Sequence, residues 1–428
     1  MNYNGALEYL AALGKFGSVL GLERIQGLLA ELEHPERKIK TIHVTGTNGK
    51  GSVTEFLSNM LAAAGISVGT FTSPHFVKYN ERITLNGQDI SDEVFAQLAT
   101  KVAAAEENFK AKGGTQPTQF EVLTAMGFLF FAQAGVDYAV IEVGMGGLWD
   151  STNVIIPEVA VITNVTLEHT NVLGKTVAAI AEQKAGIIKS GVPVVTAATD
   201  EALKVIRAKA QQENAPLFVY GEEFRSEPLD FTKYGQSFQF VFKQETAEYA
   251  IKLLGDHQIV NGALALAAAK LLATKEPRLT HETMVQGMAR TTWPGRLELL
   301  ATEPTVLLDG AHNPSGVTVL RKALDKYFPK GRRFFVFGMM ADKDMVQVSD
   351  ILFRQEDKIF TVLADDSPRA ARPEDLSTII GSRAIACSNV LAAYQQALQS
   401  AEPQDVVCVC GSLYLIGTFK AARQAVQQ

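Results

Sequence analysis

The chain has 428 residues, of which 47% are hydrophobic and 20% are charged, and its formal net charge is −6. This length exceeds one ordinary core and predicts two or three domains. The acidic balance disfavours nucleic-acid and anionic-membrane partners, which bind basic faces. The three cysteines, Cys387, Cys408 and Cys410, are an odd number without framework spacing, so we expect buried free thiols.

The sequence contains no predicted export or membrane segment. Residues 1–16 lack the basic region and following apolar region of a signal peptide. The most apolar stretches, such as "MGFLFFAQAG" at 126–135, are shorter than the roughly 20 residues that a bilayer span requires. These features predict a cytoplasmic protein.

Short apolar, β-branched runs alternate with helical stretches in the first half of the chain. This alternation favours an open, mostly parallel sheet flanked by helices, and therefore the α/β class. Buried parallel strands are predicted at 41–46, 138–144, 159–165 and 192–197. Helices are predicted at 51–65 and 176–190, and the clearest loop at 111–119.

The pattern changes near residue 237. A β-hairpin or small antiparallel addition is predicted near 237–254, and a long alanine-rich helix follows at 257–273. The sequence Trp293-Pro294-Gly295 then breaks regular structure, and we place a domain boundary at 293–296. Strands resume at 305–310, 332–338, 358–364 and 405–411. We therefore predict two α/β domains, a first with a mostly parallel sheet over 1–293 and a Rossmann-like second over 296–428.

The stretch "HVTGTNGKGS" at 43–52 has the setting of a phosphate-binding loop, between a strand and a helix. Its spacing differs from the common loop G-x-x-x-x-G-K-[ST]. Only two residues separate Gly46 from Gly49, and an extra glycine separates Lys50 from Ser52. Lys50 can neutralise terminal phosphates, and the Ser52 hydroxyl can bind Mg²⁺. The loop therefore predicts that the first domain, 1–293, is of the P-loop ATPase type.

Three further polar residues follow predicted strands or lie on a helix. Glu142 ends an apolar strand, which is where open α/β sheets bind ligands. His169 follows the next strand, and from spacing alone it is either a ligand or a structural histidine. Lys184 lies on a predicted helix, where an ordinary surface lysine is the simpler interpretation.

Eight motifs follow one another over nearly the whole chain: "VTGTNGKGS", "TSPHFVKYNERI" at 72–83, "IEVGMGGLWDSTN", "HTNVLGKTVAAIAEQKAGIIK", "HQIVNGALALAAA", "WPGRLE", "LLDGAHNP" and "CGSLYLIG". In this order they resemble the Mur ligase superfamily of ATP-dependent amide-bond ligases. The segment at 72–83 resembles its folate branch, the folylpolyglutamate synthases and dihydrofolate synthases.

The resemblance implies that ATP phosphorylates a glutamate carboxylate of a reduced folate. The amine of free L-glutamate then attacks the acyl phosphate and expels phosphate. Phosphoryl activation is needed because a carboxylate resists direct attack by an amine, and Mg²⁺ with Lys50 would offset the charge. The resemblance leaves room for a monovalent cation such as K⁺, and we expect a monomer.

The resemblance also implies roles for individual residues, with Lys50, Lys184 and His312 as the catalytic set. The implied ATP contacts are Thr47, Asn48, Gly49, Lys50, Gly51, Ser52, Asn261, Arg296 and Asp309. The implied Mg²⁺ ligands are Ser52, Ser73, Glu142, His169 and Lys184, the lysine as its carbamate. Phe120 and Asp150 are implied near the pterin, and His312 and Ser412 near the incoming glutamate.

One departure and several alternatives accompany this interpretation. The family usually has Arg-Leu where this chain has Leu148-Trp149, which puts pterin specificity in question but not the ATP site. Dihydrofolate synthase, or both activities on one site, fits the same motifs. A peptidoglycan-type Mur ligase is disfavoured because the ATP loop begins too early for a preceding UDP-binding domain. A P-loop kinase would give a phosphorylated product in place of an amide.

Overall fold

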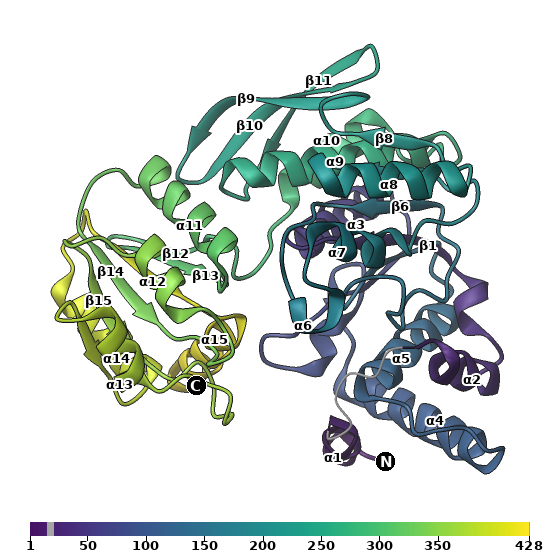
Figure 1. Ribbon diagram of the computed structural model, residues 1–428, viewed down its shortest axis with the longest axis horizontal. Helices are drawn as coiled ribbons and strands as arrows, with labels where there is room; N and C mark the ends of the chain where they lie inside the picture. Colours follow the sequence, from purple (N-terminus) through teal and green to yellow (C-terminus); the bar gives the residue numbers. More distant parts are fainter. Residues whose placement is uncertain (15–20, 428) are drawn as a thin grey trace.

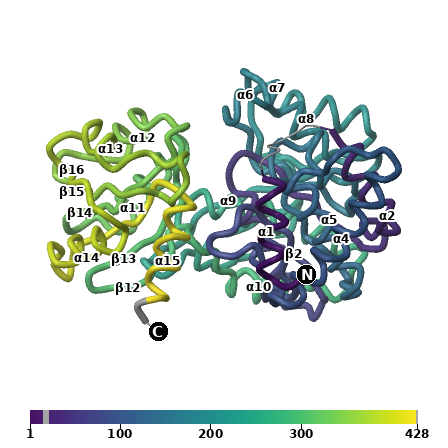
Figure 2. The backbone as a smooth tube through the Cα atoms, turned by 90° about the horizontal axis from the view of Figure 1, so that it is seen from below, coloured from purple at the N-terminus to yellow at the C-terminus, as the bar shows by residue number. Residues whose placement is uncertain are grey.

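The computed structural model describes residues 1–14 and 21–427, and two α/β units lie side by side in both views (Figures 1 and 2). The first unit contains an eight-stranded sheet and a separate three-stranded sheet, and the second contains a six-stranded sheet. None of the helices in these described ranges combines the length and hydropathy that crossing a bilayer requires.

The eight-stranded sheet has the order β4-β3-β2-β5-β1-β6-β7-β8. Its six strands from β2 to β8 are parallel, and the edge strands β3 and β4 are antiparallel. The strands are β1 (Lys40–Thr45), β2 (Val68–Phe71), β3 (Ile83–Leu85), β4 (Gln88–Asp89), β5 (Tyr138–Glu142), β6 (Val159–Ile162), β7 (Val194–Thr196) and β8 (Leu217–Val219). The four predicted strands of this sheet are confirmed as β1, β5, β6 and β7.

Alternate residues of the strands enter different cores. Val140 packs with α3, α9 and α10 on one face, whereas its neighbour Ile141 packs with α1, α2, α4 and α5 on the other. The helices α7 and α8 cover the rest of that second face, beyond β6. The bounds are α1 (Tyr3–Leu13), α2 (Glu23–Glu31), η2 (Pro35–Lys38), α3 (Lys50–Ala63), η3 (Tyr79–Arg82), α4 (Asp92–Ala111), α5 (Gln119–Ala134), α6 (Thr170–Leu173), α7 (Val177–Ala185), α8 (Asp200–Gln212), α9 (Asp256–Ala273) and α10 (His281–Arg290).

The predicted antiparallel addition is confirmed and has one more strand than expected. Strands β10 (Gly235–Phe242) and β11 (Glu245–Ile251) form the hairpin, and β9 (Phe224–Thr232) pairs with the other edge of β10. This small sheet reaches toward the second unit (Figure 1). There Tyr327 donates its hydroxyl to Gln236 (2.7 Å) and accepts the N–H of Gly255 (3.1 Å).

The second unit has the strand order β12-β13-β17-β14-β15-β16, in which only β12 is antiparallel. The predicted strands are confirmed as β13, β14, β15 and β17. Two cores cover the opposite faces, and the three cysteines are buried free thiols, as predicted. The elements are β12 (Glu298–Thr302), β13 (Thr305–Asp309), α11 (Pro314–Tyr327), β14 (Arg333–Phe337), α12 (Met345–Leu352), β15 (Lys358–Thr361), α13 (Pro373–Ile380), β16 (Ala384–Ala386), α14 (Val390–Ser400), β17 (Val406–Cys410) and α15 (Leu413–Gln427).

Candidate functional site

A cavity of about 780 Å³ is lined by residues from both units. It opens at the carboxyl ends of β1 and β5 in the first unit and of β13 in the second, where α/β sheets bind ligands. Sixteen of the seventeen predicted site residues line it: Thr47, Asn48, Gly49, Lys50, Gly51, Ser52, Ser73, Phe120, Glu142, Asp150, His169, Asn261, Arg296, Asp309, His312 and Ser412. Lys184 does not line the cavity.

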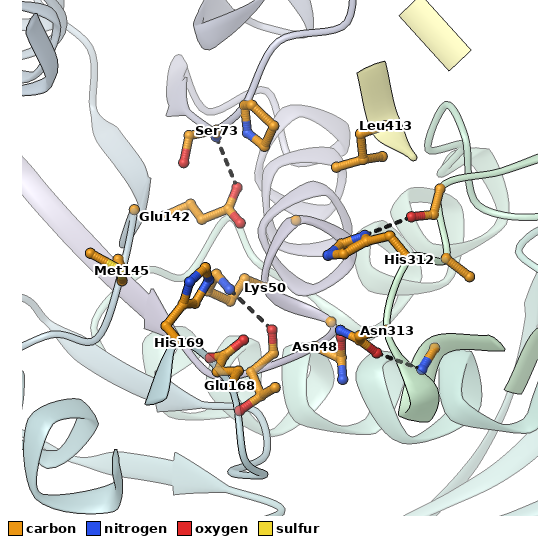
Figure 3. A pocket seen from close by; sticks show the side chains of 18 of the residues that line it. Asn48, Lys50, Ser73, Glu142, Met145, Glu168, His169, His312, Asn313 and Leu413 are labelled. Carbon is orange, nitrogen blue, oxygen red and sulfur yellow. Dashed lines mark hydrogen bonds between the residues drawn. The ribbon is translucent and has the colours of Figure 1, made fainter. Parts of the chain in front are cut away.

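The glycine-rich loop forms a tight turn between β1 and α3. Gly46 (φ +151°) and Gly49 (φ +89°) adopt left-handed backbone conformations that favour glycine. The Lys50 ammonium donates to the carbonyls of Gly46 (2.9 Å) and Thr47 (3.2 Å), so it bends back over the loop (Figure 3). This geometry presents a cation and the N-terminus of a 14-residue helix to the cavity.

Two residues that follow β6 form hydrogen bonds with this loop. The Thr163 hydroxyl donates to the carbonyl of Asn48 (2.6 Å), and the Asn48 N–H donates to the Asn164 side chain (3.0 Å). Thr163 and Asn164 are not among the site residues predicted from the sequence, although polar residues directly after a buried strand indicate a ligand site.

Helix α9 approaches the loop so closely that a side chain at Gly49 would collide with it. A Cβ there would lie 2.4 Å from Oδ1 of Asn261. The amide of Asn261 is itself oriented, because its Nδ2 donates to Gln258 (3.0 Å). The predicted ATP-contacting residues on α3 and α9 are therefore adjacent in space.

Glu142 is a buried carboxylate at the end of β5, with 4% of its surface exposed. Within residues 1–14 and 21–427, its one hydrogen bond is from the Ser73 N–H, at 3.3 Å (Figure 3). Burial raises the pKa of Glu142 to about 7, against the opposing influence of Lys50. A buried carboxylate with so few donors is suited to a cation.

The oxygen and nitrogen donors around Glu142 suit a Mg²⁺ ion that a nucleotide also binds better than a Mg²⁺ ion bound by the protein alone. Across residues 1–14 and 21–427, no three His, Cys, Asp or Glu side chains gather around one point. Mg²⁺ typically uses one or two carboxylates together with substrate phosphates and waters. Glu142, the hydroxyls of Ser52 and Ser73, and His169 could complete such a shell; His169 has a left-handed backbone (φ +44°) at the start of α6.

Lys184 is almost fully buried behind the cavity, with 1% of its side chain exposed, and donates to Glu168 at 2.6 Å. Glu168 itself lines the cavity. Burial lowers the pKa of Lys184 to about 8, although Glu168 opposes that shift. Glu168 was not selected from the sequence; it directly precedes His169, and only the fold brings it to Lys184.

The wall from the second unit is built around the end of β13. Asp309 is buried and accepts the N–H groups of Leu297 and Ala311, each at 2.9 Å. Burial raises the pKa of Asp309, and the nearby Arg296 opposes this. His312 Nδ1 lies 2.9 Å from the carbonyl of Gly310 (Figure 3). A carbonyl only accepts, so Nδ1 carries the proton, and Nε2 of the neutral ring has a free lone pair.

The remaining wall carries Asp150, which accepts from the Met145 N–H (2.9 Å), the Thr152 N–H (3.0 Å) and the Thr152 hydroxyl (2.6 Å). Because that hydroxyl donates to Asp150, it must accept from Nε2 of His43 at 2.9 Å. His43 was missed because it lies inside β1 in an apolar run. Phe120 packs against the same segment, since a Cβ on Gly144 would lie 2.5 Å from its ring.

The departure at Leu148-Trp149 also falls at this wall. Trp149 lines the cavity and is 42% exposed, whereas Leu148 contacts α7, where a Cβ at Gly186 would lie 2.4 Å from its Cα. The unusual tryptophan is thus the member of the pair that faces the cavity. It lies beside Asp150, so the part of the site in question is the region around Asp150 and Phe120.

Comparison with known proteins gives two matching family models and many relatives. Residues 44–269 match the Mur ligase middle domain, and residues 295–413 match the Mur ligase, glutamate ligase domain. A dihydrofolate synthase/folylpolyglutamate synthase of Bacillus subtilis is 40% identical over 87% of this chain and 88% of its own. A folylpolyglutamate synthase of Lacticaseibacillus casei is 36% identical over 98% of both.

Solved structures agree with these matches. The structure of E. coli FolC in complex with DHPP and ADP superposes with a TM-score of 0.90 at 29% identity, covering 100% of this chain and 99% of the other. An FPGS-AMPPCP complex superposes with a TM-score of 0.88 at 33% identity, covering both chains fully. The chain therefore belongs to the Mur ligase family and, within it, to the folylpolyglutamate synthases and dihydrofolate synthases.

Proposed function

We propose that this ATP-dependent ligase joins L-glutamate to a reduced folate through an acyl phosphate, as a folylpolyglutamate synthase. One observation carries the proposal: a single cavity brings the glycine-rich loop of the first unit against His312 and Ser412 of the second. ATP, the folate and L-glutamate can then meet in one enclosure. That the chain acts as a monomer remains a prediction made from the sequence.

The nucleotide would bind on the loop side. The loop amides and the start of α3 would receive the phosphates, and the Lys50 ammonium would leave its two carbonyl contacts to pair with them. Mg²⁺, bound through Glu142, Ser52, Ser73 and His169 together with the nucleotide, would supply charge neutralisation. Asn261, Arg296 and Asp309 would contact the rest of ATP from both units.

In the first chemical step, a carboxylate oxygen of the folate attacks the γ-phosphorus of ATP, and ADP leaves. In the second, the amine of L-glutamate attacks the activated carbonyl carbon. The tetrahedral intermediate collapses, the bond from carbon to the phosphate-bearing oxygen breaks, and phosphate departs with that oxygen. Lys50 would balance the negative charge that spreads over the transferring phosphoryl group.

The attacking amine must first lose a proton, and His312 would accept it. Its Nδ1–H is committed to the Gly310 carbonyl, which leaves Nε2 as the basic atom. Burial lowers the pKa of His312, so the ring is neutral near pH 7. The neighbouring Ser412 would bind L-glutamate, and Phe120 and Asp150 would hold the pterin.

Lys184 has a separate proposed role as a carbamate. With a pKa of about 8, roughly a tenth of its amine is neutral at pH 7 and able to add CO₂ with loss of a proton. The product is an oxygen anion that suits Mg²⁺. Carbamylation would end the ion pair with Glu168, because the nitrogen would no longer be a cation.

The domain roles follow from the same arrangement. The unit over 1–293 would bind ATP and the folate, and the unit over 296–428 would bind glutamate and close on the nucleotide. A requirement for K⁺ and a cytoplasmic location remain predictions made from the sequence.

The test measures ADP release with Mg-ATP, L-glutamate and either a reduced folate or dihydropteroate, followed by mass analysis of the pterin product. We expect an amide product one glutamyl residue heavier from the reduced folate. Dihydropteroate belongs in the assay because the Bacillus subtilis relative carries both enzyme names. Release of ADP with a phosphorylated final product would instead indicate a kinase.

A further inference from the structure

The segment 72–83 supplies an arginine to the cavity that the proposed function does not yet use. Arg82 ends η3 and lines the cavity. Its Nε–H donates to Nδ1 of His75 at 2.9 Å. The imidazole must accept at that nitrogen, so His75 orients the guanidinium while adding no charge of its own.

Arg82 forms no ion pair with any described residue, although it is largely enclosed. Burial lowers its pKa, which reflects the cost of a cation removed from water. Two arginines that are enclosed elsewhere have carboxylate partners: Arg24 contacts Glu121 at 3.0 Å, and Arg321 contacts Asp357 at 2.7 Å. An enclosed guanidinium that keeps its terminal N–H groups for a cavity is suited to an anionic ligand.

The nearest acidic side chain in the segment is already committed elsewhere. Glu81 accepts the backbone N–H groups of Phe76 (2.6 Å), Val77 (2.8 Å) and Lys78 (2.8 Å), so it closes the turn that carries Arg82. Glu142 influences Arg82 electrostatically, but Glu142 accepts its hydrogen bond from the Ser73 N–H. The guanidinium carbon of Arg82 lies 5.8 Å from the centroid of the Tyr79 ring, and no carboxylate of the described residues hydrogen-bonds to it, so its terminal N–H groups can serve an anionic ligand.

The surroundings of Arg82 show which end of the ligand it faces. The His75 ring lies against Tyr79, with centroids 4.3 Å apart, and the Tyr79 hydroxyl accepts from Gln119 at 3.1 Å. Gln119 precedes Phe120 on the wall proposed for the pterin. Tyr414 of the second unit also influences Arg82 electrostatically and lines the same cavity. Arg82 therefore has neighbours from the wall proposed for the pterin and from the unit proposed to bind glutamate, as a group that holds the tail of a folate would.

We infer that Arg82 binds the α-carboxylate of the terminal glutamate of the folate substrate, the carboxylate that is not activated. This inference rests on the proposed function and identifies which group of the substrate Arg82 binds. A guanidinium can hold a carboxylate through two parallel hydrogen bonds. Dihydropteroate has a single carboxylate, the one that reacts, so Arg82 favours glutamylated folates over dihydropteroate.

The test compares two substrates in the full-length enzyme: a reduced monoglutamyl folate, and its analogue in which 4-aminobutyrate replaces the glutamate. The analogue keeps the distal carboxylate and lacks only the α-carboxylate. In wild type we expect kcat/KM for the folate to exceed that for the analogue by roughly 10- to 100-fold. In Arg82→Met that preference should fall to about 2-fold or less, mainly through KM for the folate.

Two further variants keep the test independent of folding. Arg82→Lys retains the positive charge but loses the two parallel N–H donors of the guanidinium, so it should keep only part of the preference for the folate over the analogue. Arg372→Met removes an exposed arginine paired with Asp375 in the second unit and should leave the preference unchanged. Equilibrium binding of the folate and the analogue, measured by calorimetry without ATP, should show the same loss in Arg82→Met.

The possible outcomes separate this inference from the proposed function. Equal losses for both substrates in Arg82→Met and Arg82→Lys would overturn the inference. A selective rise in KM for free L-glutamate would also overturn it, because Arg82 would then read the incoming amino acid. A wild-type enzyme that ligates glutamate to neither compound would overturn the proposed function itself.

Discussion

Replacing Gly49 with alanine tests the glycine-rich loop most sharply. The backbone at Gly49 has φ +89°, and a Cβ there would lie 2.4 Å from Oδ1 of Asn261. The left-handed conformation alone costs an L-residue roughly 1–2 kcal/mol. The collision adds a displacement of either the loop or α9, and both carry proposed ATP contacts.

Gly65→Ala is the matched control at the other end of the same helix. Gly65 follows α3, has φ +69°, and a Cβ there would meet nothing within 4 Å. Backbone strain should cost each variant about 1–2 kcal/mol of stability, and Gly49→Ala should lose more than Gly65→Ala because only its Cβ collides with a neighbour. Only Gly49→Ala should bind nucleotide more weakly, by about tenfold or more, which corresponds to about 1.4 kcal/mol.

Thermal unfolding measures the stability that each variant loses, and calorimetric titration with a non-hydrolysable ATP analogue measures its affinity for the nucleotide. A Gly49→Ala protein that binds the analogue as tightly as wild type would refute the placement of the phosphates on this loop. Equal weakening in both variants would also refute it, because helix strain alone would then explain the effect.

Three further predictions concern single side chains. Lys50→Ala should leave thermal stability nearly unchanged and nearly abolish ADP release; a folded variant that retains most of its turnover would contradict the loop assignment. Lys184→Ala should lose activity and regain part of it with added short carboxylic acids, whereas Lys184→Arg should stay inactive; no rescue, together with an unmodified Lys184 in an active crystal, would exclude the carbamate. Burial, aided by Lys189, lowers the pKa of His43 from 6.5 to about 3. The unfolded chain then binds more protons, so this contribution to stability is complete above pH 6.5 and is lost as the pH falls toward 3. At pH 5 it has fallen by about 2 kcal/mol relative to pH 7. His43→Gln should therefore lose less stability than wild type between pH 7 and pH 5 in denaturant titrations, and parallel losses would contradict it.

Sequence patterns predicted the strands that are apolar and bounded by turns. The central strands β1, β5, β6 and β7 are buried over nearly their whole length and are rich in Val, Ile and Thr, which makes them easy to recognise. The strands that were missed lack a continuous buried run of Val, Ile and Thr. β2 is short and contains glycine, and most of β9 is exposed and carries mixed residues.

The site was predicted where one residue type in one motif determines the chemistry. The glycine-rich loop and Glu142 are of this kind, since local sequence places both at strand ends. The residues that were missed act through tertiary contacts: His43 reaches Asp150 only through Thr152, and Glu168 reaches Lys184 only when α7 packs beside α6. The spacing of residues in the sequence indicates neither contact.

The central claim is that one cavity forms an acyl phosphate and then an amide, and an isotope experiment tests it most directly. The reacting carboxylate of a reduced folate is labelled with heavy oxygen and incubated with enzyme, Mg-ATP and L-glutamate. Mass analysis of the released phosphate should show one labelled oxygen for each amide formed, because phosphate leaves with the carboxylate oxygen. Unlabelled phosphate alongside amide product would contradict the acyl phosphate mechanism.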